Sequence, residues 1–434
     1  MQRETCILGS GLTGLAAGFT SNLPIYEATY SLGGICSSYY LHPNTQERFQ
    51  TSIDNEFYRF ELGGGHWIFG GNPVVIKFIR SLVDVKTYKR NSAVFFSKNR
   101  QMIPYPLQNH LSHFDSKISS NALPEILKPS QINATTMSDW HYQNFGTTLS
   151  KLFFEPFHER YTAGLWTQIE PQDSYKSPLD VPLIIQGASQ ETPSVGYNSN
   201  FLYPNEGLNS LIIKLASSCD IRFGHKATKI DTKSREIFFG NGTSIYYERI
   251  ISTIPLNYIA EIVDLDIDEK PDPWTSVLTL NIGAVRGSAC PNVHWIYTPD
   301  SKSGCYRIGF YSNVDSSFLP KHDWRNNNLV SLYAERAYKG GQKPTTKEIQ
   351  LYTQFLIQEL QEWEFIKQVE VVDPTWIEVA YTWTWSGSVW QCKLLNCLEE
   401  QEIYQIGRYG RWRFQGIADS IGEGLLAGVT LKPR

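Results

Sequence analysis

Three glycines near the start of the chain have the spacing that accommodates a bound diphosphate. Gly9, Gly11 and Gly14 follow the apolar run 6–8 and precede the small residues 15–18. We therefore expect a buried strand, a tight turn and a helix, in that order. In such a unit the first glycine permits the turn, the second lets the backbone approach a pyrophosphate, and the third lets helix and strand pack closely. Free N–H groups at the helix N-terminus would then face the phosphates of a dinucleotide.

An acidic residue and further glycines extend this motif. Glu27 follows the next short apolar run, where dinucleotide-binding folds place a carboxylate for the ribose hydroxyls. Gly33 and Gly34 come soon after it, which is typical of FAD folds rather than of NAD dehydrogenases. Three consecutive glycines at 63–65 cost too much backbone entropy to lie idle in a strand. We expect them beside a flat ligand, with His66 lining the flavin. The cofactor-binding residues predicted from these turns are Gly9, Gly11, Thr13, Gly14, Glu27, Ala28, Gly33, Gly34, Gly64 and Gly65.

Length and composition exclude several classes of protein. The 434 residues are too many for one typical core and indicate two or three lobes. A net charge of −4 gives no global basic field for nucleic acid. Seven scattered cysteines without a C-x-x-C pair favour reduced thiols and predict no metal site. No apolar run approaches the ~20 residues of a membrane span, and the first motif lies too near Met1 for a signal peptide. We therefore expect a cytoplasmic protein without a membrane span, and the oligomeric state stays open.

The remaining pattern predicts the elements that position these residues. Residues 110–200 have mostly helical spacing, with a polar joint at 116–121. Residues 273–335 are rich in strand-forming residues and are expected to form a substrate sheet, whereas 346–368 have the spacing of one helix. The Asn-Gly pair at 241–242 predicts a hairpin turn between two strands.

Three stretches farther along the chain resemble one family. Residues 105–109 (YPLQN), 305–313 (CYRIGFYSN) and 407–412 (GRYGRW) are similar to UDP-galactopyranose mutases, especially the eukaryotic type. The N-terminal motifs are shared with flavin amine oxidases and protoporphyrinogen oxidases, so the later stretches carry the discrimination. The resemblance implies a non-redox isomerase that needs reduced FAD. In that reaction flavin N5 attacks the anomeric carbon of a nucleotide sugar, and pyranose and furanose forms interconvert.

The same resemblance implies an α/β fold in three parts. It would consist of an FAD-binding Rossmann-like domain of the GR2 type, an inserted helical domain and an antiparallel substrate sheet. The implied ranges are 1–90 with 203–270 and 400–434 for the FAD-binding domain, 110–200 for the helical domain, and 91–109 with 271–399 for the substrate sheet domain.

The resemblance also assigns roles to individual residues. Arg307 and Arg408 match the two family arginines near the leaving diphosphate, and an arginine fork suits two phosphate oxygens. These two arginines and His66 are the predicted catalytic residues. Gly407 and Arg408 are added to the cofactor-binding set. The predicted substrate-binding residues are Tyr105, Gln108, His158, Trp295, Tyr297, Arg307, Tyr381 and Phe414.

Departures from the family pattern lie on the substrate side and leave the sugar and the base open. Phe414 stands where the family has a pyrophosphate-binding tyrosine, and Leu107 replaces an aromatic residue beside the uracil. An FAD-dependent oxidoreductase of the amine oxidase or protoporphyrinogen oxidase type is therefore a second hypothesis, favoured by the shared N-terminal motifs. A non-catalytic flavoprotein is a third.

Overall fold

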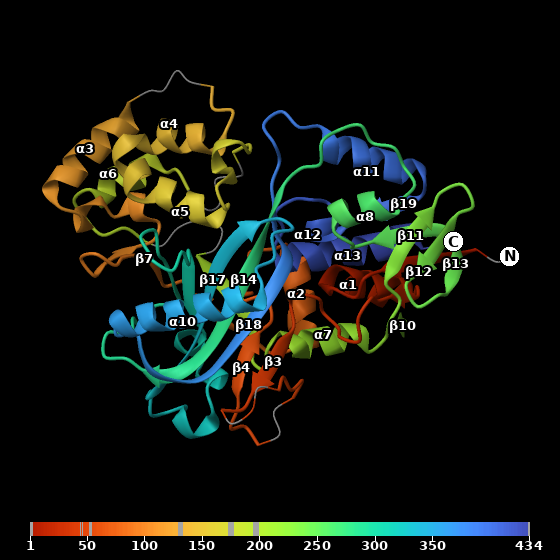
Figure 1. The fold of residues 1–434 in the computed structure, drawn as a ribbon, viewed down its shortest axis with the longest axis horizontal. Helices are drawn as coiled ribbons and strands as arrows, with labels where there is room; N and C mark the ends of the chain where they lie inside the picture. Colours follow the sequence, from red (N-terminus) through yellow and green to blue (C-terminus); the bar gives the residue numbers. More distant parts are fainter. Residues whose placement is uncertain are drawn as a thin grey trace.

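Two seven-stranded sheets and a separate group of helices make up the computed structural model (Figure 1). The structure describes residues 3–43, 45, 47–51, 54–128, 133–171, 178–193 and 199–432. Within them the chain has the mixed α/β fold that the sequence predicts. The first sheet holds the glycine-rich turn, and the second contributes one wall of a large cavity.

The first sheet is parallel around its first strand. Its order is β10-β2-β1-β13-β12-β11, with β19 also paired to β13. The pairs among β10, β2, β1, β13 and β19 are parallel, whereas β11, β12 and β13 form an antiparallel meander. The strands are β1 (Glu4–Leu8), β2 (Ile25–Tyr26), β10 (Ile221–Arg222), β11 (Ala227–Asp231), β12 (Glu236–Phe239), β13 (Ser244–Ser252) and β19 (Ile403–Gln405).

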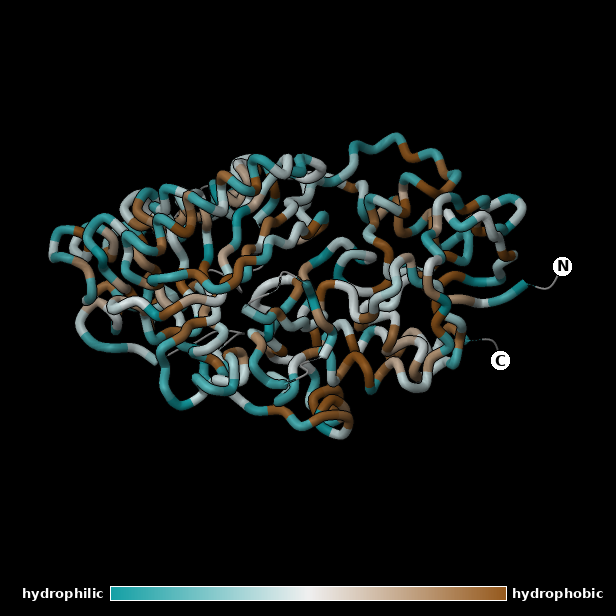
Figure 2. Tube along the Cα trace, turned by 60° about the horizontal axis from the view of Figure 1, so that its bottom comes forward, coloured by the Kyte–Doolittle hydropathy of each residue, from teal (hydrophilic) through white to brown (hydrophobic). Residues whose placement is uncertain are grey.

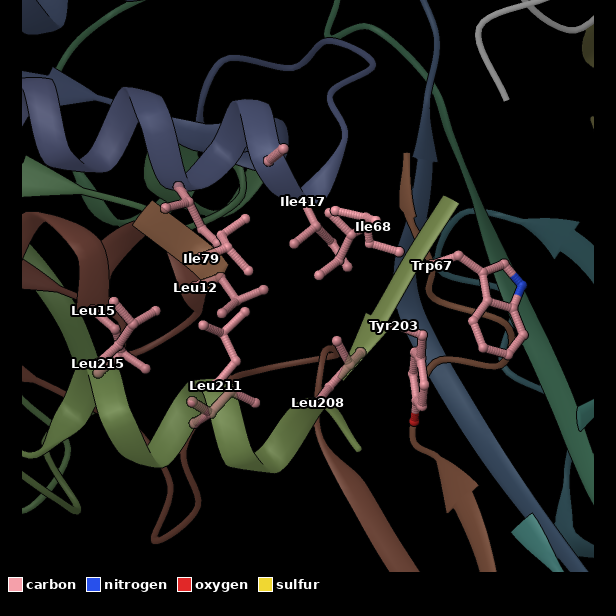
Figure 3. Close-up of a cluster of buried hydrophobic side chains, with 14 of the residues drawn as sticks. Leu12, Leu15, Trp67, Ile68, Ile79, Tyr203, Leu208, Leu211, Leu215 and Ile417 are labelled. Carbon is pink, nitrogen blue, oxygen red and sulfur yellow. The ribbon is translucent and has the colours of Figure 1, made fainter. Parts of the chain in front are cut away.

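Three helices pack together beside this sheet. They are α1 (Leu12–Ser21), α7 (Leu208–Ala216) and α13 (Ile417–Leu431). Figure 3 shows Leu12 and Leu15 of α1 pointing toward Leu211 and Leu215 of α7, all of them at most 6% exposed. On its other side α1 contacts α13 through glycines, because a Cβ at Gly424 would lie 2.2 Å from the Thr13 carbonyl oxygen. The two helices can approach this closely only while that side chain is absent.

The second sheet is almost wholly antiparallel. Its order is β18-β14-β17-β16-β15-β7-β8, and only β15 and β7 are parallel. One face packs on α10 (Thr346–Glu362) through a buried cluster that includes Leu280, Leu332 and Leu356. The strands are β7 (Ser92–Phe96), β8 (Gln101–Pro104), β14 (Trp274–Arg286), β15 (Trp295–Tyr297), β16 (Arg307–Phe310), β17 (Leu329–Lys339) and β18 (Ile366–Thr382).

A group of helices stands apart from both sheets, at the upper left of Figure 1. Its buried residues form a hydrophobic cluster that continues into the second sheet at Val94 of β7 and Ile103 of β8. The elements are α3 (Ser116–Leu127), α4 (Met137–Leu149), the π-helical turn η3 (Ser150–Phe154), α5 (Glu155–Tyr161), the 3-10 turn η4 (Leu165–Thr167) and α6 (Val181–Gly187).

Shorter elements connect these parts. Two of them are small sheets, with β5 and β6 flanking β9 and with β3 paired to β4. Their bounds are β3 (Ser38–Leu41), β4 (Tyr58–Glu61), β5 (Ile68–Phe69), β6 (Val85–Lys89), β9 (Asn200–Pro204), α2 (Pro73–Leu82), α8 (Leu256–Ile262), α9 (Tyr311–Val314), α11 (Trp390–Glu400), α12 (Gly407–Gly410), η1 (Leu107–Asn109), η2 (Leu111–His113), η5 (Ser316–Phe318) and η6 (Lys321–Asp323).

Two sequence predictions about helices are wrong at their boundaries. Residues 116–121, predicted as a joint, begin α3, because the Asp115 side chain caps the helix by accepting from Ile118 N. The helix predicted over 346–368 ends at Glu362, and β18 begins four residues later. Glu364 has φ +60°, and Phe365 N donates to the Leu360 carbonyl, which closes the helix end. The predicted Asn-Gly hairpin turn is confirmed between β12 and β13.

Hydrophobic residues are distributed in short runs along the whole trace (Figure 2). Within the part of the chain that the structure describes, no helix has the length and apolar character needed to cross a membrane.

The glycine contact between α1 and α13 predicts a stability effect. Replacing Gly424 by alanine (Gly424→Ala) should lower the free energy of unfolding by about 1–3 kcal/mol, because overpacking forces backbone to move. Urea denaturation of the purified protein measures the change. Val429→Ala is the matched control on the same helix, since Val429 is 54% exposed. Equal stabilities of the two variants would contradict the close packing.

Candidate functional site

A cavity of about 830 Å³ lies between the two sheets. The glycine-rich turns line one end of it, and aromatic and charged residues of the second sheet line the other. The predicted site residues that line it are Gly9, Gly11, Thr13, Glu27, Ala28, Gly33, Gly34, Gly65, His66, Trp295, Tyr297, Arg307, Tyr381, Gly407, Arg408 and Phe414.

The first glycine-rich turn has the geometry of a phosphate cradle. Gly9 has φ +97°, and a Cβ at Gly14 would lie 2.0 Å from the Gly9 carbonyl oxygen. Packing therefore requires glycine at both positions. At Gly11 an added Cβ would meet no atom within 4 Å, although this residue also lines the cavity. The glycine there leaves room for a ligand rather than for another part of the protein.

The second glycine pair closes over this turn. Gly33 N donates to the Ser10 carbonyl at 2.9 Å, and Gly33 forms an isolated parallel bridge with Gly11. At the end of β2, the Glu27 carboxylate accepts from Ser10 N at 2.8 Å and from Thr29 N at 2.9 Å. Backbone amides, a carboxylate and open space thus lie together, which is the donor and acceptor set that a dinucleotide requires.

Arg408 contributes to the cavity a cation with which no carboxylate pairs among the described residues. Its Nη1 and Nη2 donate to the carbonyls of Gln415 at 3.4 Å and Ala380 at 3.3 Å. The guanidinium lies against the rings of Tyr381 and Phe414, with 4.9 Å from Cζ to the latter centroid. Among the residues that the structure describes, no Asp or Glu forms an ion pair with it. A buried cation needs a counter-charge, so this end of the cavity favours an anion.

Arg307 is held by an ion pair with Glu335, its cross-strand partner on β17. Nε donates to Oε2 at 2.8 Å and Nη2 donates to Oε1 at 2.6 Å. Tyr306 also donates its hydroxyl to Oε2 at 2.6 Å. The Glu335 side chain is 2% exposed and that of Arg307 is 22% exposed. The pair therefore engages one edge of the guanidinium and leaves its other N–H groups for the cavity.

The glycines at 63–65 pack against protein, and Gly63 and Gly65 also line the cavity. A Cβ at Gly65 would lie 2.1 Å from the Tyr333 hydroxyl, and one at Gly64 would lie 2.8 Å from Oε1 of Glu335. His66 follows them, with Nδ1 3.3 Å from the Gly64 carbonyl oxygen. Burial lowers the pKa of His66 to about 4; the Gly64 carbonyl opposes this shift and the charge of Arg408 adds to it. The imidazole is therefore neutral at pH 7.

Five of the predicted site residues do not line the cavity. Tyr105 lies behind Tyr297, with ring centroids 4.7 Å apart. Gln108 is fully buried and donates to the Pro178 carbonyl at 2.6 Å. The ring of His158 lies against that of His141 inside the helical group, with centroids 4.1 Å apart and the planes tilted by 46°. Their substrate contacts stay predictions. The other two are Gly14, which packs on Gly9, and Gly64, which packs on Glu335.

Sequence reasoning missed several lining residues, chiefly Glu335, Tyr333 and Gln415. Glu335 lies in the apolar run of β17, where a lone carboxylate signals a cation on the neighbouring strand. Tyr333 lies two residues earlier and so faces the same side of the sheet. No local pattern marks Gln415, because its exposure to the cavity depends on how α13 is placed.

Comparison with known proteins gives one family match. A model of flavin-containing amine oxidoreductases matches residues 13–275, which is from the first glycine-rich turn to the start of β14.

Solved structures agree in fold at low sequence identity. A reduced UDP-galactopyranose mutase superposes with a TM-score of 0.82 at 20% identity, over 98% of this chain and 95% of that one. A protoporphyrinogen oxidase candidate from Exiguobacterium sp. 255-15 gives 0.70 at 14%, over 99% and 98%. A putrescine oxidase bound to putrescine gives 0.57 at 12%, over 99% and 98%. The fold is therefore common to a mutase and to oxidases, and the reaction has to be argued from the site.

The ion pair of Arg307 predicts a large cost for its removal. Glu335→Gln should lower the free energy of unfolding by about 3 kcal/mol, because it leaves a largely buried guanidinium without its counter-charge. Chemical denaturation of the variant and the wild type measures this change in the free energy of unfolding. The control is Glu364→Gln, whose partner is Arg100 and whose side chains are both 52% exposed. The control should be silent, since exposed pairs contribute little. A silent Glu335 variant would show that the cavity solvates Arg307.

The lowered pKa of His66 predicts acid sensitivity. The unfolded imidazole takes up a proton near its ordinary pKa of about 6.5, whereas the folded one stays neutral until about pH 4. The unfolded state binds more protons between these values, so stability falls as the pH falls through this window. His66→Asn should reduce the loss of unfolding free energy between pH 7.5 and pH 5 by about 2 kcal/mol. Parallel urea curves at both pH values measure this, and identical pH slopes would exclude it.

Proposed function

The chain belongs to the family of flavin-containing amine oxidoreductases, and from that premise we propose that it is a mutase of nucleotide sugars that depends on reduced FAD. The proposed reaction interconverts the pyranose and furanose forms of a UDP-linked sugar. The flavin dependence follows from the family. The choice of FAD, of the reduced state and of the substrate is our proposal.

One observation carries the substrate class. Arg408 presents a guanidinium to the cavity, and its hydrogen-bond acceptors among the described residues are two backbone carbonyls. Arg307 adds a second guanidinium, half engaged by Glu335. With His66 neutral, the substrate end holds two positive charges against one negative charge. A diphosphate supplies the missing negative charge and matches the arginine forks.

FAD fits the other end of the cavity. The amides of the turn from Gly9 to Gly14 would hold its pyrophosphate, and Glu27 would accept from the ribose of its adenosine. The open space at Gly11 supports this assignment, because no protein atom lies within 4 Å of an added Cβ. FAD, when bound and reduced, supplies a nucleophilic ring nitrogen for the anomeric carbon of the sugar.

The residues of this chain then have positioning tasks. Arg307 and Arg408 would bind the diphosphate and stabilise its charge as it leaves the sugar. Trp295 and Tyr297 lie two residues apart on β15, and Trp295 Nε1 donates to the Tyr297 hydroxyl at 3.3 Å. This pair would give the sugar and base a wall of fixed orientation. Phe414 offers a ring but no hydroxyl, so fewer donors reach the diphosphate than in the family that the sequence resembles.

An oxidoreductase is the alternative, and the aromatic lining favours it. Tyr297, Tyr306, Tyr333, Tyr381 and Phe414 all line the cavity, and such surfaces suit amines and porphyrins. The two guanidinium groups argue against an amine, because they would repel a cationic substrate.

Ligand binding and turnover can be measured on the same dithionite-reduced protein. UDP and UDP-galactose should bind saturably by flavin fluorescence, and UDP-galactopyranose should be converted to the furanose without oxygen uptake. Arg408→Ala should weaken UDP binding by about 30-fold, since a charge-assisted hydrogen bond contributes about 2 kcal/mol.

The matched control is Arg411→Ala, one helical turn away, whose guanidinium pairs with Glu399 at 3.6 Å. This variant should bind UDP as the wild type does. Absence of UDP binding, together with oxygen uptake on putrescine or protoporphyrinogen, would replace the mutase by an oxidase.

A further inference from the structure

A buried acceptor without a partner faces the cavity beside the start of α13. Gln415 is 8% exposed and lines the cavity. Its Nε2 donates to Oε2 of Glu423 at 2.7 Å, whereas its Oε1 has no hydrogen-bond partner among the described residues. A carboxylate can only accept at neutral pH, so the NH₂ group must face Glu423 and the carbonyl must face away. Such an orphan acceptor is costly unless a ligand supplies a donor.

Donors for the same ligand lie next to this acceptor. Gly416, Ile417 and Ser420 at the start of α13 also line the cavity. The Asp419 carboxylate accepts from the N-cap amide of Gly416 at 3.2 Å, and the glycine N-cap offers no side-chain acceptor to the amides that follow it. The helix is 15 residues long, so its N-terminus carries a substantial positive dipole end. One acceptor and several amide donors therefore converge on one part of the cavity.

The packing of α13 on α1 locates this part relative to the phosphate cradle. Gly424 is level with Thr13 and Gly428 is level with Ala17, so the two helices run parallel. The first residue of α13 lies seven residues before Gly424, whereas that of α1 lies one residue before Thr13. At 1.5 Å per residue, α13 projects about 9 Å beyond the start of α1. A ribityl chain leading from the pyrophosphate spans such a gap, so the flavin ring reaches Gln415.

We propose that Gln415 and the start of α13 bind the imide edge of the flavin ring. This edge presents two carbonyls with a single N–H, at N3, between them, and in oxidised flavin N3 is the only N–H of the ring. Gln415 Oε1 accepts from N3–H, and the amides of α13 donate to the neighbouring carbonyl. Uracil has the same imide edge. We assign the site to the flavin because the flavin is linked to the pyrophosphate at the α1 cradle, whereas the diphosphate of a UDP-sugar would lie at Arg307 and Arg408.

This inference rests on the FAD part of the proposed function and not on the sugar reaction. N3 keeps its proton in both the oxidised and the reduced flavin. Gln415 therefore contributes to the affinity for both states alike and leaves the midpoint potential unchanged.

FAD and 3-methyl-FAD, which lacks the N3 proton, test the contact on the apoprotein. The wild type should bind FAD at least tenfold more tightly than 3-methyl-FAD, measured by flavin fluorescence. Gln415→Ala should bind FAD about tenfold more weakly and should discriminate less than twofold, because it removes the acceptor and leaves room for the methyl group. Gln415→Leu, which keeps the volume of the side chain, should weaken FAD binding to the same extent with an unchanged midpoint potential.

The matched control is Gln405→Ala. Gln405 is 2% exposed, its amide atoms also have no partner among the described residues, and it does not line the cavity. This variant should discriminate as the wild type does. Full discrimination in Gln415→Ala would overturn the proposal. The proposal would also be overturned if Gln415→Ala lost the preference for UDP over CDP but still discriminated between FAD and 3-methyl-FAD. Gln415 would then bind the base of the substrate. None of the flavin measurements needs a nucleotide sugar, so they remain decisive if UDP-galactose is not a substrate.

Discussion

The close approach of α1 to the first turn is the constraint on which the site depends. A Cβ at Gly14 would lie 2.0 Å from the Gly9 carbonyl oxygen, so the helix starts directly against the strand that precedes it. The amides of this turn thereby face the cavity at a fixed position. The same helix accepts α13 through Gly424 and Gly428, whose added Cβ atoms would lie 2.2 Å from backbone carbonyls. The contacts of α1 with the first turn and with α13 thus place the N-terminal and C-terminal parts of the site next to each other.

Charge balance shapes the other end of the cavity. Glu335 neutralises Arg307 and orients it by two hydrogen bonds, whereas Arg408 contacts two backbone carbonyls and the rings of Tyr381 and Phe414. Burial keeps His66 neutral between them, with a pKa of about 4. The result is a site with one compensated and one uncompensated guanidinium. The nucleotide diphosphate that we propose as part of the substrate would meet charge at Arg408 and a fixed fork geometry at Arg307.

The glycine run 63–65 borders the cavity, as the sequence predicts, but it is also required for packing against the second sheet. Consecutive glycines predict that the backbone closely approaches another group, and the expected group is a flat ligand. The backbone does border the cavity at Gly65, but the space that a Cβ would need is taken by Tyr333 and Glu335. The second sheet therefore packs directly on the loop that carries His66. This contact therefore fixes His66 relative to Tyr333 and Glu335 of β17.

The sequence by itself determined the α/β class, the glycine-rich turn between β1 and α1 and most of the elements, because glycine spacing and hydrophobic periodicity are local properties. Most of the site residues that it predicted do line the cavity, because motif residues lie at the ends of predictable elements. It misplaced the end of the helix at Glu362, where a left-handed residue at Glu364 reverses the chain. The contacts between residues far apart in the sequence could not be predicted. Glu335 meets Arg307 only through strand pairing, and Gln415 faces the cavity only because α13 packs parallel to α1. Such long-range contacts follow from how the sheets and helices pack, and no local pattern encodes them.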